Sequence, residues 1–262
     1  MITAYHRPHS VHEALALMNR ATPVTLPLGG GTFLSHGVAE GIEVVDLQSL
    51  GLDRIMTKGN DLEIGATATL QSLLEHSSCP ASMRVPLKLE APLNIRNAAT
   101  VAGTLVTCNG RSTLSTALLA LDARLTVHSV QPPGVAAQKG ASARSQGAQN
   151  LGDFLPLRPA GLITKVTVPL HTRLAFQYVA RTPTDKPIVC VALAQWPSGR
   201  TRLAVGGFGP APSLALDGTE SAGIEIAARN AFHDANDEWS SAEYRMDVAA
   251  TLAARCLSGI AP

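Results

Sequence analysis

The apolar positions of the first 57 residues change from helical to extended spacing along the chain. Ser10 is a good N-cap, and residues 11–19 carry apolar side chains at the spacing of a short amphipathic helix. Residues 24–28 and 43–47 are short apolar runs, as expected for strands. A glycine-rich turn follows the first of these strands. We therefore predict an N-terminal α/β unit over residues 1–57.

The middle of the chain mixes strands with helices. The dipeptide Gly59-Asn60 lies between two apolar runs, which predicts a β-hairpin over residues 55–66. Thr69 is a good cap for a helix that runs to Leu74. Later apolar segments predict helices around 83–90 and at 114–121, and strands at 124–128 and 162–168. Together these elements predict a central α+β unit over residues 58–170.

One stretch of this unit has a different composition. Residues 131–150 consist mainly of Gly, Ala, Ser, Gln and Pro with scattered charges. Because few of these side chains can pack into a core, we predict a mobile loop. Order is predicted to resume at Phe154.

The last 92 residues, 171–262, predict a sheet followed by helices. Turn residues separate three extended apolar segments, which indicates a three-stranded antiparallel sheet. These segments are residues 174–180, 188–195 and 202–206. A Gly- and Pro-rich stretch at 206–210 is predicted to end the sheet, and helices are expected at 221–232 and 242–257. The predicted fold class is therefore α+β, with two N-terminal subdomains and a C-terminal domain of sheet and helices.

Composition excludes several functional classes. A formal net charge of +1 gives no electrostatic argument for binding nucleic acid. No apolar run is long enough to span a membrane, and the N-terminus lacks the features of a signal peptide. The four cysteines lie far apart, so we expect a cytoplasmic protein with reduced thiols and no metal site of its own. Charged residues make up only 16%, which either coverage by partner subunits or the high alanine content explains.

Two small-residue segments carry the candidate chemistry. Residues 27–34 read PLGGGTFL, and residues 95–105 read IRNAATVAGTL. Consecutive glycines can adopt positive φ and allow another group to approach the backbone closely. Two such turns, each with a threonine near glycine, present N–H donors that suit a phosphate-bearing ligand.

These segments resemble a known family. The order of five blocks is similar to that of the FAD-binding medium subunit of molybdenum hydroxylases, the xanthine dehydrogenase and carbon monoxide dehydrogenase group. GGGTFL stands where the family has AGGTDL, and IRNAATVAGTL stands where it has IRNxATIGGNI. The other blocks are LEIGA at 62–66, LLALDA at 118–123, and Arg181 with Asp185 followed by AVGG at 204–207. The resemblance covers nearly the whole chain and implies the FAD-binding type-2 (PCMH-like) fold.

The resemblance also implies a function. FAD would lie between the first two units, with its pyrophosphate held by both glycine turns, and the third unit would pack over the isoalloxazine end. The chain would be an oxidoreductase subunit that passes electrons through FAD, in a hetero-oligomer with an iron–sulfur small subunit and a molybdenum-cofactor large subunit that oxidises the substrate. No side chain is assigned a catalytic role. The cofactor-binding residues that the resemblance implies are Leu28, Gly29, Gly30, Gly31, Thr32, Phe33, Leu34, Ala99, Thr100, Gly103, Thr104, Thr107, Thr113, Leu162 and Lys186.

The chain departs from the family pattern at several of these positions. Phe33 and Thr113 stand where the family has acidic residues, and Thr104 stands where it has asparagine. Ala102 replaces a glycine, and Gln177 replaces a lysine near the flavin. Losing a charge-assisted contact costs on the order of 1.5–3 kcal/mol, so several losses would weaken FAD binding strongly. Two hypotheses therefore remain: a flavoprotein subunit, and a flavin-free structural or assembly paralogue.

Three further side chains have two interpretations each. Lys186 is either a flavin contact or part of an ordinary hairpin tip. Arg96 either braces the second turn, which we favour, or faces a partner subunit. Asp122 is interpreted as a helix terminator or a surface acid rather than a catalytic group.

Overall fold

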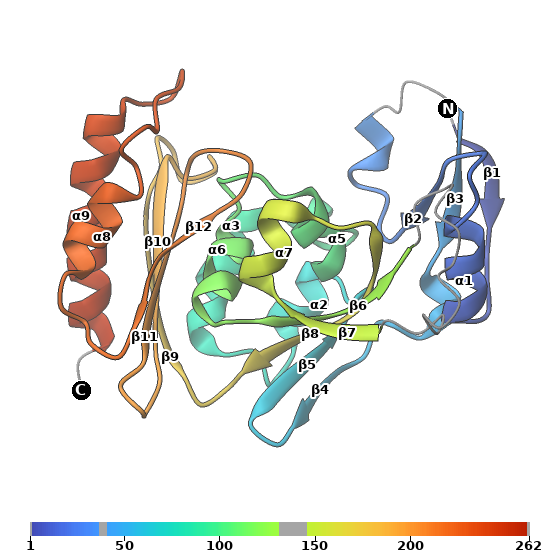
Figure 1. Cartoon of the computed structure of the whole chain (residues 1–262), viewed down its shortest axis with the longest axis horizontal. Coiled ribbons are helices and arrows are strands. Elements are labelled where there is room, and N and C mark those ends of the chain that lie inside the picture. The colour runs from blue at the N-terminus through green and yellow to red at the C-terminus, as the bar shows by residue number, and fades with distance from the viewer. Residues whose placement is uncertain (1, 37–40, 131–145, 261–262) are drawn as a thin grey trace, which may run out of the picture.

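Three β-sheets, each with its own helices, follow one another along the molecule (Figure 1). The computed structural model describes residues 2–36, 41–130 and 146–260. Within these ranges no helix combines the length and the apolar character needed to cross a bilayer. The N-terminal sheet and the C-terminal helices lie at opposite ends, and the central sheet with its helices lies between them (Figure 1).

The N-terminal sheet is parallel and has the strand order β1-β3-β2. Its elements are β1 (Ile2–His6), α1 (Val11–Met18), β2 (Thr25–Leu28), η1 (Leu34–His36), β3 (Ile42–Asp46) and η2 (Gln48–Leu50). Ser10 caps α1 as predicted, because its hydroxyl accepts a hydrogen bond from the Glu13 N–H. The short strand β1 was not predicted. The small core beneath α1 contains Ala14, Val45 and Leu47, and Leu162 of the central sheet completes it.

The central sheet has the order β4-β5-β8-β6-β7. Its strands are β4 (Ile55–Lys58), β5 (Asp61–Gly65), β6 (Arg124–Ser129), β7 (Gln146–Asn150) and β8 (Gly161–Pro169). Its helices are α2 (Leu70–Glu75), η3 (Ala81–Met83), α3 (Arg84–Glu90), α4 (Leu93–Arg96), α5 (Val101–Thr107), α6 (Thr113–Ala120) and α7 (Leu151–Leu157). The predicted hairpin at 55–66 and the Thr69 cap of α2 are confirmed. The division of the chain at residues 57 and 170 stays a prediction, and β4 lies across the first of these positions.

The prediction of a mobile loop over residues 131–150 is wrong for its last five residues. Gln146–Asn150 form β7, which pairs antiparallel with β6 at the edge of the sheet. The strand is held by backbone hydrogen bonds, so its lack of apolar side chains does not prevent pairing. Residues 131–145 lie outside the described residues.

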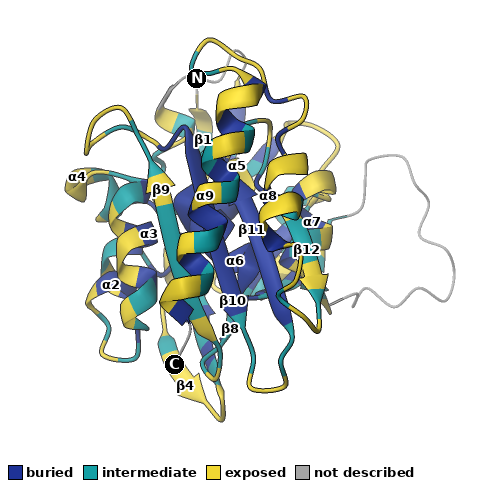
Figure 2. Cartoon of the chain, turned by 90° about the vertical axis from the view of Figure 1, so that its left-hand side faces the viewer, coloured by how far each residue is buried: buried dark blue, intermediate teal, exposed yellow. Residues whose placement is uncertain are grey.

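The C-terminal sheet has four strands, so the prediction of three was wrong. In spatial order these are β12 (Ser213–Gly218), β11 (Thr201–Gly206), β10 (Val189–Gln195) and β9 (Arg173–Val179), followed along the chain by α8 (Ile224–Asn230) and α9 (Ala242–Ile260). The Gly- and Pro-rich stretch at 206–210 turns the chain back instead of ending the sheet, and β12 pairs antiparallel with β11. Because α6 packs near one face and α9 near the other, β10 and β11 are buried along most of their length (Figure 2).

An ion cluster joins the central unit to this last sheet. Asp122 ends α6 in the left-handed conformation, with φ of 55°, as expected for a helix terminator. Its carboxylate lies 2.9 Å from Nη1 of Arg200, in the turn before β11, and 3.3 Å from Nη1 of Arg202, in β11. Asp217 of β12 pairs with the same two arginines, at 2.8 and 2.6 Å. The two aspartates thus bind one pair of guanidinium groups from both sides.

This cluster predicts an acid-sensitive fold. The hydrogen bond from Arg200 holds the pKa of Asp217 below its ordinary value of 3.8. A carboxylate with a lowered pKa stabilises the fold above its unfolded pKa, and that stability is lost as the pH falls through the folded value. We expect the free energy of unfolding to fall more steeply below about pH 4 in the wild type than in Asp217→Asn, as urea titrations between pH 7 and 3 will measure.

Asp234→Asn is the matched control, because this side chain is 96% exposed and, among the described residues, bonds to His233 alone. Its pH profile should follow that of the wild type. Parallel profiles for the wild type and Asp217→Asn would show that the cluster contributes nothing to acid sensitivity.

Candidate cofactor site

The two glycine-containing segments meet at the boundary between the first and second sheets. The turn after β2 lies so close to the loop before α5 that a Cβ on Gly30 would lie 1.6 Å from the Ala98 carbonyl oxygen. A Cβ on Gly29 would lie 2.9 Å from Thr100 Oγ1, and Gly31 has a φ of +70°. Only glycine permits this backbone approach. The turns that the sequence placed seventy residues apart are therefore in direct contact.

Backbone hydrogen bonds fix the second segment to the central unit. The Leu70 N–H donates to the Ala99 carbonyl at 2.9 Å, and the Val101 N–H donates to the Ala68 carbonyl at 2.9 Å. The second segment was interpreted as a turn throughout, but its residues 95–96 end α4 and its residues 101–105 belong to α5, with Thr100 as the N-cap. Thr100 Oγ1 accepts a hydrogen bond from the Gly103 N–H at 3.1 Å. Arg96 braces this segment, as favoured: its guanidinium donates to Gln71 Oε1 and to the Ala91 carbonyl.

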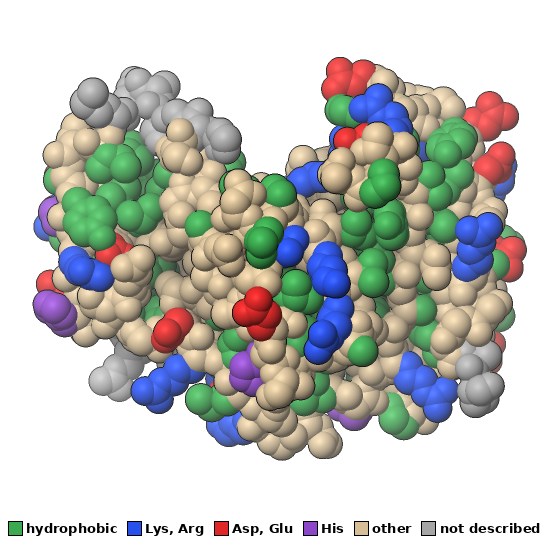
Figure 3. Space-filling view, turned by 180° about the vertical axis from the view of Figure 1, so that it is seen from behind, with side chains coloured by type: hydrophobic (Ala, Val, Ile, Leu, Met, Phe, Trp, Pro, Cys, Tyr) green, Lys and Arg blue, Asp and Glu red, His purple; other side chains and the backbone are tan. Residues whose placement is uncertain are grey.

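Two hollows lie beside the contact between the two glycine-containing segments. The first, the apolar cavity, has a volume of about 340 Å³, and its lining is mostly apolar. Both glycine turns, α5 and β8 line it, as do Leu26, Pro27, Leu47, Ala66, Val106 and Ile163. The second, the polar trough, has a volume of about 550 Å³ and is lined by both turns and by Gln48, Asp53, Thr67, Thr69 and Asn97. Seen from behind, the surface is indented between the two ends of the molecule (Figure 3).

The polar groups of the apolar cavity divide into donors and acceptors. Among the described residues, no protein acceptor receives the N–H groups of Gly30, Gly31 and Thr32. Thr104 Oγ1 donates to the Thr100 carbonyl at 2.9 Å, and Thr107 Oγ1 donates to the Gly103 carbonyl at 2.9 Å. The first turn therefore offers hydrogen-bond donors, which suit phosphate oxygens. The two helix threonines use their protons internally, so their oxygens are available as acceptors.

The structure brings most of the predicted site residues together. Those that line the apolar cavity are Gly29, Gly30, Gly31, Thr32, Phe33, Leu34, Thr100, Gly103, Thr104, Thr107 and Leu162. Leu28 lines the polar trough. Three predicted residues, Ala99, Thr113 and Lys186, line neither hollow. Their assignment to the cofactor stays a prediction.

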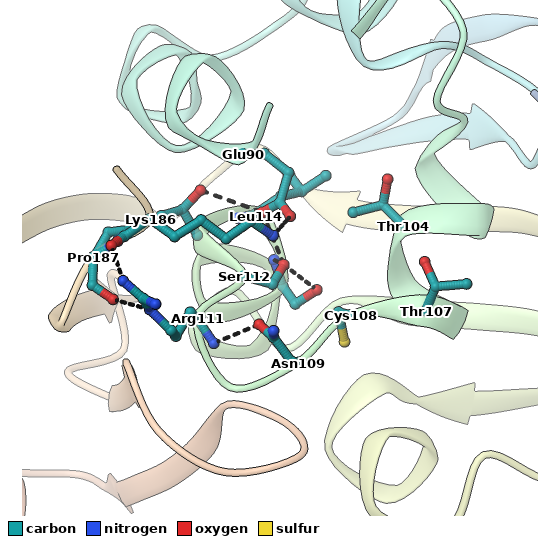
Figure 4. A network of polar contacts seen from close by, with 12 residues as sticks. Glu90, Thr104, Thr107, Cys108, Asn109, Arg111, Ser112, Leu114, Lys186 and Pro187 are labelled. Carbon is teal, nitrogen blue, oxygen red and sulfur yellow. Dashed lines mark hydrogen bonds and ion pairs between the residues drawn. The ribbon is translucent and has the colours of Figure 1, made fainter. Parts of the chain in front are cut away.

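Thr113 and Lys186 both contact Glu90, which is the centre of a polar network. Figure 4 shows Glu90 and Lys186 in this network. Glu90 is 7% exposed, and its Oε2 accepts hydrogen bonds from Ser112 Oγ at 2.8 Å and from the Leu114 N–H at 2.9 Å. Thr113 is fully buried and donates to the Pro86 carbonyl at 2.7 Å. Lys186 Nζ lies 3.6 Å from Glu90 Oε1. The chain's own carboxylate thus accepts the Leu114 N–H in the first turn of α6, and the Thr113 hydroxyl also contacts it, at 3.3 Å.

The loop before α6 ties this network to the third sheet. Arg111 Nε donates to the Pro187 carbonyl at 2.9 Å, beside Lys186 (Figure 4). The Gly110 N–H donates to the Gly209 carbonyl at 2.8 Å, and a Cβ on Gly110 would lie 1.7 Å from the Phe208 carbonyl oxygen. A second close glycine contact therefore fixes the third sheet against the central unit.

The sequence offered little signal for several lining residues. Leu26 and Leu47 are strand or strand-end residues, and Ile163 belongs to β8, far along the chain. Their apolar character predicts burial but not which cavity they face. In the polar trough, Asn97 lies inside the recognised segment IRN, which was the one available signal. No group of three or more His, Cys, Asp or Glu side chains among the described residues is arranged to hold a metal ion.

Comparison with known proteins decides the family. Residues 1–171 match the family model described as the FAD binding domain in molybdopterin dehydrogenase. The chain belongs to this family. FAD is its cofactor, and the glycine contact, the free N–H groups and the apolar cavity fit a dinucleotide with a pyrophosphate and flat rings. The resemblance to the FAD-binding medium subunit of molybdenum hydroxylases is confirmed.

Two sequence relatives and two solved structures illustrate the similarity. The chain is 26% identical over 263 residues to the uncharacterized protein YgfM of Escherichia coli K12. This alignment covers 97% of this chain and 95% of YgfM. It is 33% identical over 175 residues to the xanthine dehydrogenase of Blastobotrys adeninivorans. That alignment covers 58% of this chain and 12% of the xanthine dehydrogenase. Reconstituted CO dehydrogenase from Oligotropha carboxidovorans matches with a TM-score of 0.78 and 23% identity, over 98% of this chain and 96% of that one. Quinoline 2-oxidoreductase from Pseudomonas putida 86 matches with a TM-score of 0.76 and 18% identity, over 98% and 96%. These structures share the predicted α+β fold, which is confirmed.

Proposed function

We propose that this chain is the FAD-binding electron-transfer subunit of a molybdenum-containing hydroxylase or dehydrogenase complex. The observation that carries the proposal is the contact between Gly30 and the Ala98 carbonyl, beside a cavity lined by both glycine turns. Two solved chains matched over almost their full length belong to a CO dehydrogenase and a quinoline oxidoreductase. In this role the chain is an oxidoreductase subunit, and the substrate is oxidised on another subunit.

The residues of the site have separate tasks. The free N–H groups of Gly30, Gly31 and Thr32 hold the pyrophosphate, replacing the water that would solvate its oxygens. Apolar side chains, among them Leu47 and Leu162, exclude water from the ring that enters the cavity. When bound, FAD supplies the electron chemistry: it accepts electrons and passes them to an acceptor. The protein's own contribution is to hold, orient and shield this group.

In the proposed assembly, each of the three predicted domains has its own role. Residues 1–57 and 58–170 together hold FAD, and residues 171–262 pack over its isoalloxazine end. The partners are an iron–sulfur small subunit and a molybdenum-cofactor large subunit in a hetero-oligomer. The cysteines Cys79, Cys108, Cys190 and Cys256 are all free and buried, which supports a reducing compartment such as the cytoplasm.

The cofactor is tested on the purified chain. We expect a yellow protein whose flavin absorbance is released on denaturation. The apoprotein should gain thermal stability with FAD, because a ligand that binds only the folded state stabilises it by RT ln(1 + [FAD]/Kd), about 2.7 kcal/mol at a hundredfold excess over Kd. A colourless protein whose melting temperature does not respond to excess FAD would support the flavin-free paralogue instead.

The assembly is tested first by asking whether genes for a molybdenum subunit and an iron–sulfur subunit lie beside the gene for this chain, and then by expressing the three together. We expect the three polypeptides to purify together, and reduction by the complex's substrate to bleach the absorbance of the oxidised flavin. A flavin-loaded chain that purifies alone, or whose flavin stays oxidised in the complex, would contradict the electron-transfer role while leaving FAD binding intact.

A further inference from the structure

Phe33 has an unusual position for a phenylalanine. Its side chain is 62% exposed, whereas Phe154 and Phe232 are 2% and 3% exposed. Phe176 and Phe208 are half-buried, and their rings lie beside Tyr178 and the Arg245 guanidinium, respectively. Phe33 follows the glycine turn, lines the apolar cavity, and makes no ring contact with another described residue. Because the exposed ring of Phe33 lies on the lining of an apolar cavity, its face is available to a group bound there.

The surroundings of Phe33 select the chemistry of that partner. Val106 of α5 lines the same cavity and is 44% exposed, so the cavity offers a second apolar surface to a bound group. Thr104 and Thr107 lie on the same helix and present acceptor oxygens, because their hydroxyl protons are already bonded. Apolar surfaces with acceptors at the edge suit a flat heteroaromatic ring that carries N–H groups. Adenine and isoalloxazine both have this character.

We propose that Phe33 stacks on a flat ring of bound FAD and is a principal determinant of FAD affinity in this chain. The inference rests on the proposed FAD site. Phe33 stands where the family pattern has an acidic residue, so a charged contact is replaced by aromatic stacking. Stacking needs only a π-face, which both rings of FAD provide, and its strength does not depend on a particular hydrogen-bond pattern.

The test measures the Kd of FAD for apoprotein by calorimetry and by flavin fluorescence. Phe33→Ala should raise Kd about tenfold, within the roughly 5- to 150-fold range expected for losing one stacked ring. Phe33→Trp should keep Kd within about threefold, because it preserves the π-face. Phe33→Asp, which restores the family's charge type, should bind at least as weakly as Phe33→Ala. Melting temperatures without ligand should be unchanged, since the side chain is largely exposed.

Val24→Ala is the matched control. Val24 is 57% exposed in the same unit and does not line the cavity, so its removal should leave Kd unchanged. Equal Kd values for the wild type and Phe33→Ala would overturn the proposal. Tighter binding by Phe33→Asp would overturn it as well, because a charged contact would then be better than stacking at this position.

Titrations with FMN and AMP separate the two rings. If Phe33 stacks on isoalloxazine, Phe33→Ala weakens FMN binding and relieves the quenching of flavin fluorescence, while AMP binding is unchanged. If Phe33 stacks on adenine, Phe33→Ala weakens the binding of AMP and leaves that of FMN unchanged. A wild-type chain that binds none of FAD, FMN and AMP would contradict the proposed function itself. Binding of FAD that is unaffected by Phe33→Ala would contradict only this inference.

Discussion

Gly30→Ala is expected to abolish FAD binding and to lower the free energy of unfolding by about 3 kcal/mol or more. The added methyl group would lie 1.6 Å from the Ala98 carbonyl oxygen, far inside any real contact distance. The Ala98 N–H donates to the Ile95 carbonyl, and hydrogen bonds to Ala68 and Leu70 hold the residues that follow Ala98, so this oxygen cannot move aside at low cost. The first turn must therefore move away from the second, and the cavity that both line must open. Urea unfolding and FAD titration measure the two effects.

The control separates the clash from the general effect of alanine. In β12, a Cβ on Gly218 meets nothing within 4 Å, and its backbone is not left-handed. Gly218→Ala should leave FAD binding unchanged and alter stability by less than about 1 kcal/mol. If Gly30→Ala binds FAD like the wild type, then the contact between the turns does not build the site. A loss of binding without a loss of stability would show that the turns can separate without cost.

The same contact shows how far the sequence could predict the site. The two segments were recognisable because small residues and threonines in this order suit a phosphate. Their contact depends on the packing of two sheets, and no local pattern records that packing. The exact partner of Gly30, the Ala98 carbonyl, was therefore not predictable from the sequence without the fold.

The fold was predicted best where side-chain periodicity decides the structure. The helix capped by Ser10 and the hairpin around Gly59-Asn60 follow from local sequence, and both are present. The strands β7 and β12 were missed because they lie at sheet edges, where backbone pairing needs no apolar run. Leu162 shows the reverse difficulty: its burial was predictable, but its place in the core of the N-terminal unit was not.

Thr113 illustrates a site residue whose environment the sequence did not reveal. Alignment with the family placed it beside the cofactor, yet its hydroxyl is buried and donates to the Pro86 carbonyl. The same hydroxyl lies 3.3 Å from Glu90 Oε2, a carboxylate that the sequence did not single out. No linear pattern connects Glu90 with α6, because the helix N-terminus reaches it only after the chain has passed through α4 and α5. The stability of this part of the fold therefore depends on a group that only the structure identifies.

Glu90→Ala is expected to cost about 3–5 kcal/mol of the free energy of unfolding. The carboxylate is 7% exposed and accepts from Ser112 Oγ and from the Leu114 N–H. Every residue of α6 is buried, so water cannot replace the lost acceptor at its N-terminus. Glu90→Gln keeps one acceptor oxygen of similar shape and should cost about 1–3 kcal/mol. Chemical denaturation of the wild type, Glu90→Gln and Glu90→Ala at neutral pH measures the free energy of unfolding, which should decrease in that order.

Lys186→Met decides which partner makes Glu90 important. Lys186 Nζ lies 3.6 Å from Glu90 Oε1, but the lysine side chain is 44% exposed, so the ion pair should contribute less than about 1 kcal/mol. If the carboxylate acts mainly as the cap of α6, Lys186→Met is mild and Glu90→Ala is severe. Equal losses for the two variants would show instead that the ion pair is the dominant interaction. FAD titration of Lys186→Met tests the predicted flavin contact. An unchanged Kd would remove Lys186 from the predicted cofactor-binding residues. A raised Kd at unchanged stability would place its ammonium group within reach of the cofactor.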